Sequence, residues 1–380
     1  MANAIGDRIR ARMREAYGES FTQSDLADSV RMTPDALSRA LNGQRQFATL
    51  ELVRVANFLQ TSLHWLATGE VDPAAAKVAA RHTYDVAARR HESIDWSAER
   101  TAIETVSTAY TQAFRSEPER PQVEIPSSAQ DARKLLLEFD QDFVRQFAES
   151  VEAVFGVEVV RVQEASRPYS IEVVGRRVVV VPPHVNWFYQ NFSIAHELGH
   201  FSSGNLEPIE EEPLASTESE RASNAYAAEL LLPREDMTAL NWSAMPLTDF
   251  ADRLWRWGVS TDFVKRRLAN LGIVPHEEIR EVLNMSTQKA LRRHLVLDES
   301  TMWVDEITDR MDRANTRRFP KGLIRAHMEA AAEGRLRPTY LAWMLETDAL
   351  ELERELGPAD EKPDLDWMLD EIERGVHPNP

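Results

Sequence analysis

The most restrictive feature of this sequence is the run "NWFYQNFSIAHELGHFSSG", residues 186–204. As a helix it carries apolar side chains around nearly its whole circumference, and such a helix has to be buried. Yet it also contains His196, Glu197 and His200, and an unpaired charge in that setting costs on the order of several kcal/mol. The apolar positions are Phe188, Phe192, Ile194, Ala195, Leu198 and Phe201.

The spacing of these three polar residues suggests a metal site. His196 and His200 are one turn apart on one helix face, so both can point a nitrogen at the same ion. Glu197 lies about 100° around the helix from His196, where it can take a proton from metal-bound water. The His-Glu-x-x-His pattern is that of zinc peptidases, and alone it is only moderately specific. The alternative is a buried His/Glu hydrogen-bond network without metal.

A catalytic zinc needs a third protein ligand, and three acids of the next predicted helix compete for that role. The helix lies in "STESERASNAYAAELLLPRE", with Ser216 or Thr217 as its cap. Glu220 is followed one turn later by Asn224, which can reach a ligand histidine. Glu218 and Glu229 have no polar residue at that position. We therefore choose Glu220.

These two segments resemble the ImmA/IrrE family of metallopeptidases, which pairs "AHELGH" with "E-x-x-A-[ND]-x-[FY]-A-A-x-L-L-x-P". The resemblance covers about residues 130–270, with Ser223 in the usual Ala position. It implies a zincin-like fold, bound Zn²⁺ (Mn²⁺ as the alternative ion), and site-specific cleavage of a repressor or antitoxin. The residues carried over are the metal ligands His196, His200 and Glu220 and the general base Glu197.

The N-terminal stretch "FTQSDLADSVRMTPDALSRALNGQRQ" predicts two short helices joined by a tight turn. Thr22 can cap the first helix, Thr33 followed by Pro34 begins the second, and Gly43 ends it. With amphipathic helices on either side, residues 4–69 resemble the five-helix lambda-repressor-like (Xre-type) domain. That resemblance implies binding to operator DNA.

The same resemblance assigns the DNA contacts. The second helix would enter the major groove, and residues before and after it would hold phosphates. Arg31 stands where the family usually has Gly, so a positive φ is expected there, and Leu41 replaces the usual Glu. The residues expected to face base edges are Thr33, Asp35, Ser38 and Arg39, and those expected to hold phosphates are Gln23, Ser24 and Arg45.

The charge distribution limits where DNA can bind. Residues 1–70 hold eight Arg and eight acidic residues, so all of the net charge of −18 lies in residues 71–380. An acidic surface repels nucleic acid, so the N-terminal domain is the only part of the chain where we expect DNA to bind. A helical dimerisation module without DNA contact is the alternative for this domain.

The remaining sequence predicts mainly α structure with a small β-sheet. Residues 73–115 look helical, and 115–128 look like a linker. A long helix ending at Gly156, with Leu135, Phe139, Phe143 and Phe147 on one stripe, precedes a strand and a hairpin about Gly175. We expect five regions: the helix-turn-helix domain 1–70, a connector 71–128, the α+β metallopeptidase domain 129–240, a segment 241–285 with helix-turn-helix rhythm, and a helical C-terminal region 286–380 of unknown role.

Composition excludes several classes of function. There is no cysteine, so disulfides, thiolate catalysis and cysteine-ligated metals are ruled out. No apolar stretch reaches the length of a membrane span, and we expect a cytoplasmic protein without a membrane partner. The acidic loop between the two site helices is expected to be solvated.

The sequence thus predicts a transcriptional regulator with a zinc-dependent peptidase domain, acting on a repressor, antitoxin or toxin in a stress or mobile-element circuit. Two alternatives stay open. The metallopeptidase fold can serve as a sensor or dimerisation module without proteolysis, or the chain can be an antitoxin-like protein that binds its partner uncut. A homodimer is compatible with each.

Overall fold

The computed structural model forms two compact units, residues 1–75 with 208–212, and 76–207 with 213–380. The finer division into five regions stays a prediction. No helix within the described ranges combines the length and the apolar character that crossing a membrane requires. The residues that the structure describes are 4–18, 21–59, 61, 63–69, 76–80, 84–85, 90–91, 96–115, 121–204, 206–208, 217–296 and 305–356. Ser216, most of the acidic loop and the tail from 357 lie outside them.

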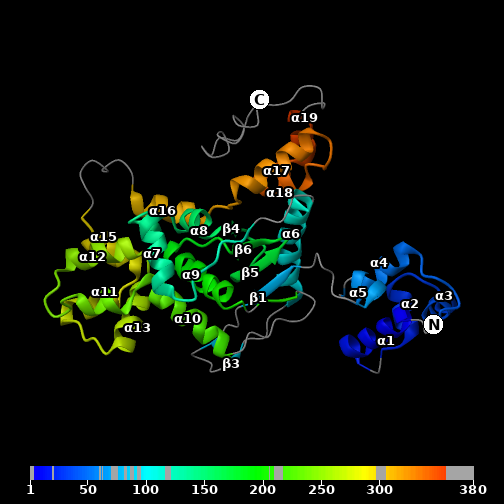
Figure 1. Cartoon of the computed structure of the whole chain (residues 1–380), viewed down its shortest axis with the longest axis horizontal. Coiled ribbons are helices and arrows are strands. Elements are labelled where there is room, and N and C mark those ends of the chain that lie inside the picture. Colours follow the sequence, from blue (N-terminus) through cyan, green and yellow to red (C-terminus); the bar gives the residue numbers. More distant parts are fainter. Residues whose placement is uncertain are drawn as a thin grey trace. The chain divides into compact units, whose positions relative to one another are not determined.

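The first unit contains the five expected helices (Figure 1). They enclose a small apolar core of fully buried side chains, which includes Ile9, Leu26, Leu37, Val55 and Leu66. This core is what a domain of such short helices needs, because none of them is stable alone. The helices are α1 (Ala4–Tyr17), α2 (Gln23–Ser29), α3 (Pro34–Leu41), α4 (Thr49–Phe58) and α5 (Leu63–Thr68).

The predicted ends of the central two helices are confirmed. Thr22 caps α2 in a reciprocal capping box with Asp25, and the Thr33 side chain accepts a hydrogen bond from the Ala36 amide at the start of α3. The turn between the helices places Arg31 at φ 56°, the positive value expected from its position. The tight turn is therefore built even without glycine.

The second unit is organised around a mixed sheet with strand order β4-β6-β5-β1-β7. β4 and β6 are parallel, whereas β5 pairs antiparallel with both β6 and β1. The predicted strand and hairpin are confirmed, with the hairpin turning at Gly175 (φ 72°). The strands are β1 (Lys77–Ala80), β4 (Val157–Arg161), β5 (Tyr169–Val173), β6 (Arg176–Val181) and β7 (Glu207–Pro208), and a separate pair is β2 (Tyr84–Asp85) with β3 (Arg90–His91).

The prediction that residues 73–115 are helical is wrong at its beginning. Residues 77–80 form β1, in which Lys77 lies opposite Glu172 and Ala80 opposite Tyr169. Pairing with a strand about ninety residues later overrides the helical propensity of this alanine-rich stretch, because propensity is a weak preference. The second half of the segment is helical as expected, in α6 (Trp96–Phe114).

The long helix expected before Gly156 is also broken. It is divided into α7 (Ala129–Phe139), a short 3-10 turn η1 (Phe143–Gln146) and α8 (Phe147–Phe155). At the break, Asp140 has an extended backbone and its carboxylate accepts a hydrogen bond from the Asp142 amide, a local bond that competes with the helix. As a result Phe143 and Phe147 are buried, while Leu135 and Phe139 on the same expected stripe are 40% and 57% exposed.

Two helices carry the candidate site. α9 (Trp187–Ser203) packs on β5 and β6, and α10 (Thr217–Leu231) packs along α9 (Figure 1). α9 begins after Asn186 and ends at Gly204, the residues expected from the sequence. Its residues from Ser193 to Phe201 are all buried, which confirms the prediction of a helix inside the core.

The rest of the second unit is helical, as predicted. Gly258, at φ 58°, ends one helix and the Ser260 side chain caps the next, so the expected helix-turn-helix rhythm is present. Another helix begins directly after Pro320. The helices are α11 (Arg234–Ala239), α12 (Leu247–Trp257), α13 (Thr261–Leu271), α14 (Glu277–Leu283), α15 (Thr287–His294), α16 (Glu306–Asn315), α17 (Lys321–Ala332), α18 (Thr339–Leu345) and α19 (Ala349–Glu355).

Candidate metal centre

The polar side chains of α9 meet one carboxylate of α10 in the interior of the second unit. His196, Glu197 and His200 are each 0% exposed, and the side chain of Glu220 is 13% exposed. The Nε2 atoms of the two histidines are 3.1 Å apart. Glu220 places Oε2 3.4 Å from Nε2 of His196 and Oε1 3.4 Å from Nε2 of His200.

These distances fit a tetrahedral metal ion. Ligand atoms about 2.0–2.2 Å from a tetrahedral zinc lie about 3.3–3.6 Å from one another. The two histidine nitrogens are 3.1 Å apart, and each lies 3.4 Å from its nearer Glu220 oxygen, Oε2 for His196 and Oε1 for His200, which are separations of that size. Two imidazole nitrogens and a carboxylate oxygen also form a donor set that zinc accepts, so this group can bind a metal.

The charge state of Glu220 suits a ligand. Burial on its own raises the pKa of Glu220, but its contacts with His196 and His200 outweigh burial and lower the pKa to about 2. The carboxylate is therefore ionised across the physiological range. A ligand has to be deprotonated before it binds a metal, and this carboxylate already is.

Asn224 lies beside the His196 ring, on the side away from His200 and Glu220, and so reaches a ligand histidine as the sequence predicted. Its Oδ1 is 3.2 Å from Nδ1 of His196. When Nδ1 carries the proton it donates to this amide oxygen, which leaves Nε2 with a lone pair turned toward His200 and Glu220. One hydrogen bond thus sets both the tautomer and the orientation of the ring.

Glu197 is held by a residue that sequence reasoning missed. Ser170, on β5, is 0% exposed, and its hydroxyl donates to Oε2 of Glu197 at 2.7 Å. The other carboxylate oxygen, Oε1, is buried without a hydrogen-bond partner among the residues that the structure describes. The only signal of Ser170 in the sequence is a small polar residue within a predicted strand, which proves to be mostly buried.

Two family models match parts of the chain. Residues 153–269 match the peptidase M78 model, described as the IrrE N-terminal-like domain, and residues 13–66 match a helix-turn-helix model. The chain carries an IrrE N-terminal-like domain behind a helix-turn-helix domain. This confirms the resemblances drawn from the sequence. Comparisons with curated proteins and with solved structures gave no match.

The IrrE N-terminal-like domain requires a very close approach between its two site helices. A Cβ atom placed on Gly199 would lie 2.8 Å from the Cα of Ser223, closer than such atoms come in proteins. Glycine therefore lets α10 lie close enough for Glu220 to reach both histidines. Ser223 itself is buried at this contact.

The two acids that were rejected as ligands lie elsewhere in the IrrE N-terminal-like domain. Glu229 pairs with Arg267 at 2.6 Å and accepts a hydrogen bond from the Arg234 amide. Glu218 is exposed. Neither belongs to the cluster of possible ligands found among the described residues.

An oxyanion needs a hydrogen-bond donor, and three side chains carry a suitable one: Tyr226, Tyr189 and His184. The Tyr226 hydroxyl donates to the carbonyl of Pro126 at 3.1 Å, and burial raises the pKa of this phenol. Tyr189 is 39% exposed and its ring lies 5.2 Å from that of His184. His184 also has a partner, because its Nδ1 accepts a hydrogen bond from the Asn186 amide at 3.0 Å.

In the helix-turn-helix domain, the residues expected to contact bases lie on the exposed side of α3. Thr33, Asp35 and Arg39 are exposed and Ser38 is half-buried. Asp35 and Arg39 form an ion pair at 2.7 Å, so the acid neutralises the one cation among them. DNA would have to compete with Asp35 for this guanidinium.

The residues expected to hold phosphates differ from one another. Gln23 and Ser24 are exposed at the start of α2. Arg45 is half-buried, and its guanidinium donates to both carboxylate oxygens of Glu51 at 2.8 Å and to the Ala36 carbonyl. Arg45 therefore stabilises the segment after α3, and its guanidinium would have to leave Glu51 before it could bind a phosphate.

Proposed function

We propose that this chain is a transcriptional regulator in which a zinc-dependent peptidase is joined to an operator-binding domain. The observation that carries the proposal is the convergence of His196, His200 and Glu220 at metal-ligand separations inside an IrrE N-terminal-like domain. These three residues would hold the ion. Zn²⁺ suits their geometry best, and Mn²⁺ is the alternative.

The chemistry follows from how the side chains lie. A bound zinc ion supplies a Lewis acid that lowers the pKa of water toward about 7 and polarises a carbonyl. Glu197 accepts the proton of the attacking water on Oε1, the oxygen without a partner, and delivers it to the leaving amine. Ser170 holds Oε2 and so fixes the carboxylate. Asn224 keeps the His196 ring in its ligating orientation.

The helix-turn-helix domain directs this activity to a locus. α3 would enter the major groove, with Thr33, Asp35, Ser38 and Arg39 toward base edges and Gln23, Ser24 and Arg45 toward phosphates. The substrate class we propose is a repressor or antitoxin protein from the same stress or mobile-element circuit. Its cleavage at one site would change transcription.

The test is to incubate the full-length protein with the repressor, antitoxin or toxin encoded at its own locus, with zinc or manganese. We expect one cleavage event that a chelator abolishes. The Glu197→Gln variant should bind zinc as the wild type does and cut nothing. Equal cleavage by both proteins would refute the role of Glu197. A stable complex with an uncut partner would refute proteolysis and support an interaction module.

A further inference from the structure

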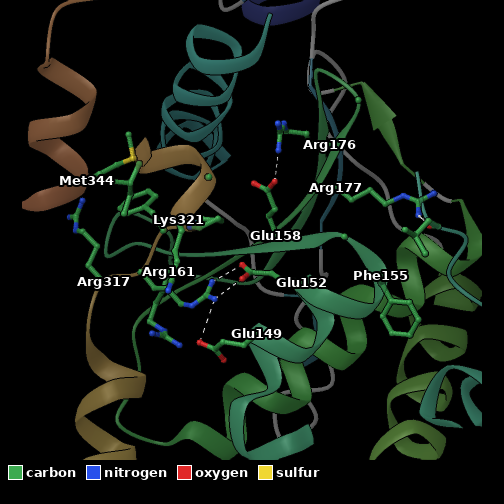
Figure 2. A pocket seen from close by; sticks show the side chains of 18 of the residues that line it. Glu149, Glu152, Phe155, Glu158, Arg161, Arg176, Arg177, Arg317, Lys321 and Met344 are labelled. Atoms are coloured by element: carbon green, nitrogen blue, oxygen red, sulfur yellow. Dashed lines mark hydrogen bonds and ion pairs between the residues drawn. The ribbon is translucent and has the colours of Figure 1, made fainter. Parts of the chain in front are cut away.

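A cavity lies in the second unit, between the sheet edge and the C-terminal helices (Figure 2). Its volume is about 810 Å³, which falls in the range of small-molecule sites. The end of β4, the start of β6 and α8 line one side, and the segment before α17 with the end of α18 lines the other. The cavity is therefore lined both by the IrrE N-terminal-like domain and by the C-terminal region, for which the sequence predicted no role.

The charge of the lining is opposite to that of the chain. Seven basic side chains but only three carboxylates line the cavity, in a protein of net charge −18. The carboxylates are already engaged: Arg318 is paired with both oxygens of Glu152 at 2.8 Å, and Arg176 with Glu158 at 2.6 Å. Two further basic groups pair with acids outside the lining, Arg313 with Asp309 and Arg317 with Glu164 and Glu346. Within the described residues, Arg161 and Arg177 are the lining arginines whose contacts are all with neutral groups.

Arg161 is the clearest of these groups. Its guanidinium donates to the Gln190 side chain and to the carbonyls of Arg313 and Thr316, all of which are neutral. No carboxylate lies within ion-pair distance of it in the described part of the chain, and its Nη2 has no hydrogen-bond partner there. Burial, and then the positive charge of Arg318, lower the pKa of this group to about 10.

The backbone forces the two arginines together. Arg161 and Arg318 lie directly opposite one another in an antiparallel bridge, with N–H···O distances of 2.8 and 3.0 Å. Like charges at opposed positions destabilise a strand pair. Both nearby carboxylates, Glu152 at 2.8 Å and Glu149 at 3.4 Å, pair with Arg318. Arg161 is therefore the guanidinium of this pair that an anion in the cavity can contact.

The N-terminus of α17 borders the same cavity. Lys321 and Gly322 line it, and no side chain caps this helix of 12 residues. The positive end of a helix favours an anion, and phosphate in particular. Apolar side chains of Phe155, Ile324 and Met344 complete the lining, which suits an organic group attached to that anion. In Figure 2, Arg161, Arg317 and Lys321 gather on one side of the view.

We propose that this cavity binds a phosphate-bearing small molecule of about nucleotide size, with its phosphate against Arg161 and the N-terminus of α17. Arginine matches the geometry of phosphate oxygens, and the apolar wall takes the organic part. A bare inorganic ion would leave most of the volume empty. The site does not depend on the metal centre.

Calorimetric titration of the full-length protein tests the proposal. The probes are AMP and glucose 6-phosphate, with adenosine, glucose and inorganic phosphate as their separate parts. At least one organic phosphate should bind saturably, and about 10-fold or more tightly than any of its parts, because hydrogen bonds to charged groups are the strong ones. Failure of both to bind, or equal binding of adenosine or glucose, would overturn the proposal.

Two variants locate the site. Gly322→Asp puts a carboxylate into open space, since a Cβ there meets nothing within 4 Å, and an acid in the first turn favours the helix. Unfolding should therefore be unchanged while binding weakens about 10-fold or more. Lys321→Glu should act alike, and Lys289→Glu, an equal charge change on α15, should have no effect. Unchanged binding in Gly322→Asp would place the ligand elsewhere and overturn the proposal.

Discussion

Gly199 and Ser223 meet so closely that one added methyl group would overlap the partner backbone, with the ideal Cβ of residue 199 only 2.8 Å from the Cα of Ser223. α9 contributes the two histidines and α10 contributes Glu220, so this contact sets the distance between the ligands. The neighbouring atom belongs to backbone, which cannot rotate away as a side chain can.

Gly199→Ala is therefore expected to destabilise the protein, although alanine is the better helix former. Overpacking costs about 1–3 kcal/mol, against a gain of about 1 kcal/mol in helix propensity. Urea denaturation should show a lower free energy of unfolding, together with weaker zinc binding. Ala222→Ser, an exposed change on α10, should leave both unchanged. A more stable Gly199→Ala protein would show that the helices can separate at no cost.

The metal ligands can be tested by stability as well as by activity. Zinc that binds only the folded state raises the unfolding temperature of the wild type. Glu220→Gln should lose most of that increase, because a neutral amide replaces an ionised ligand. Glu218→Gln makes the same change at an exposed position and should keep the increase. The same zinc response in both variants would remove Glu220 from the site.

Ser170→Ala tests whether the hydroxyl positions the general base. Losing a hydrogen bond to a charged group costs about 1.5–3 kcal/mol, so kcat should fall about 10-fold or more. Zinc affinity should stay unchanged, because Ser170 contacts Glu197 and not the ligands. Ser150→Ala removes another buried serine hydroxyl, which donates to the Phe143 carbonyl, and serves as the control. A loss of zinc rather than of kcat would mean that Ser170 supports the fold alone.

Arg39→Ala tests base reading by α3. A side chain that reads a base edge contributes about 1–3 kcal/mol of discrimination, so the ratio of specific to random DNA binding should fall. Arg54→Ala removes an exposed arginine of α4 that has no predicted contact, and it should change that ratio little. Electrophoretic mobility shifts with both DNAs at one salt concentration measure the effect. Identical ratios in the two variants would place the reading surface elsewhere.

The sequence predicted best the features that rest on local patterns. α9 was located because its apolar positions cover the whole circumference and because Asn186 and Gly204 delimit it. The caps at Thr22 and Thr33 follow the same local rules. Glu220 lies 3.4 Å from both histidines, on the helix face that Asn224 one turn later indicated, and its role as a ligand stays a prediction.

What the sequence did not predict depends on contacts between distant segments. β1 forms by pairing with β5, about ninety residues later in the sequence, and Ser170 reaches Glu197 only once the sheet lies on α9. The break at Asp140 comes from a side-chain bond that competes with the helix. The basic cavity is assembled from residues as far apart as Arg161 and Lys321, so no single stretch reveals it.

The most direct test of the account is zinc-edge X-ray absorption, with metal analysis, on the full-length protein loaded with zinc and freed of excess ion. We predict one zinc per chain, bound by two imidazole nitrogens and a carboxylate oxygen at about 2.0–2.2 Å. His196→Ala and His200→Ala should each lose that signal. A protein that holds no zinc, or a signal that survives in both variants, would contradict the central claim.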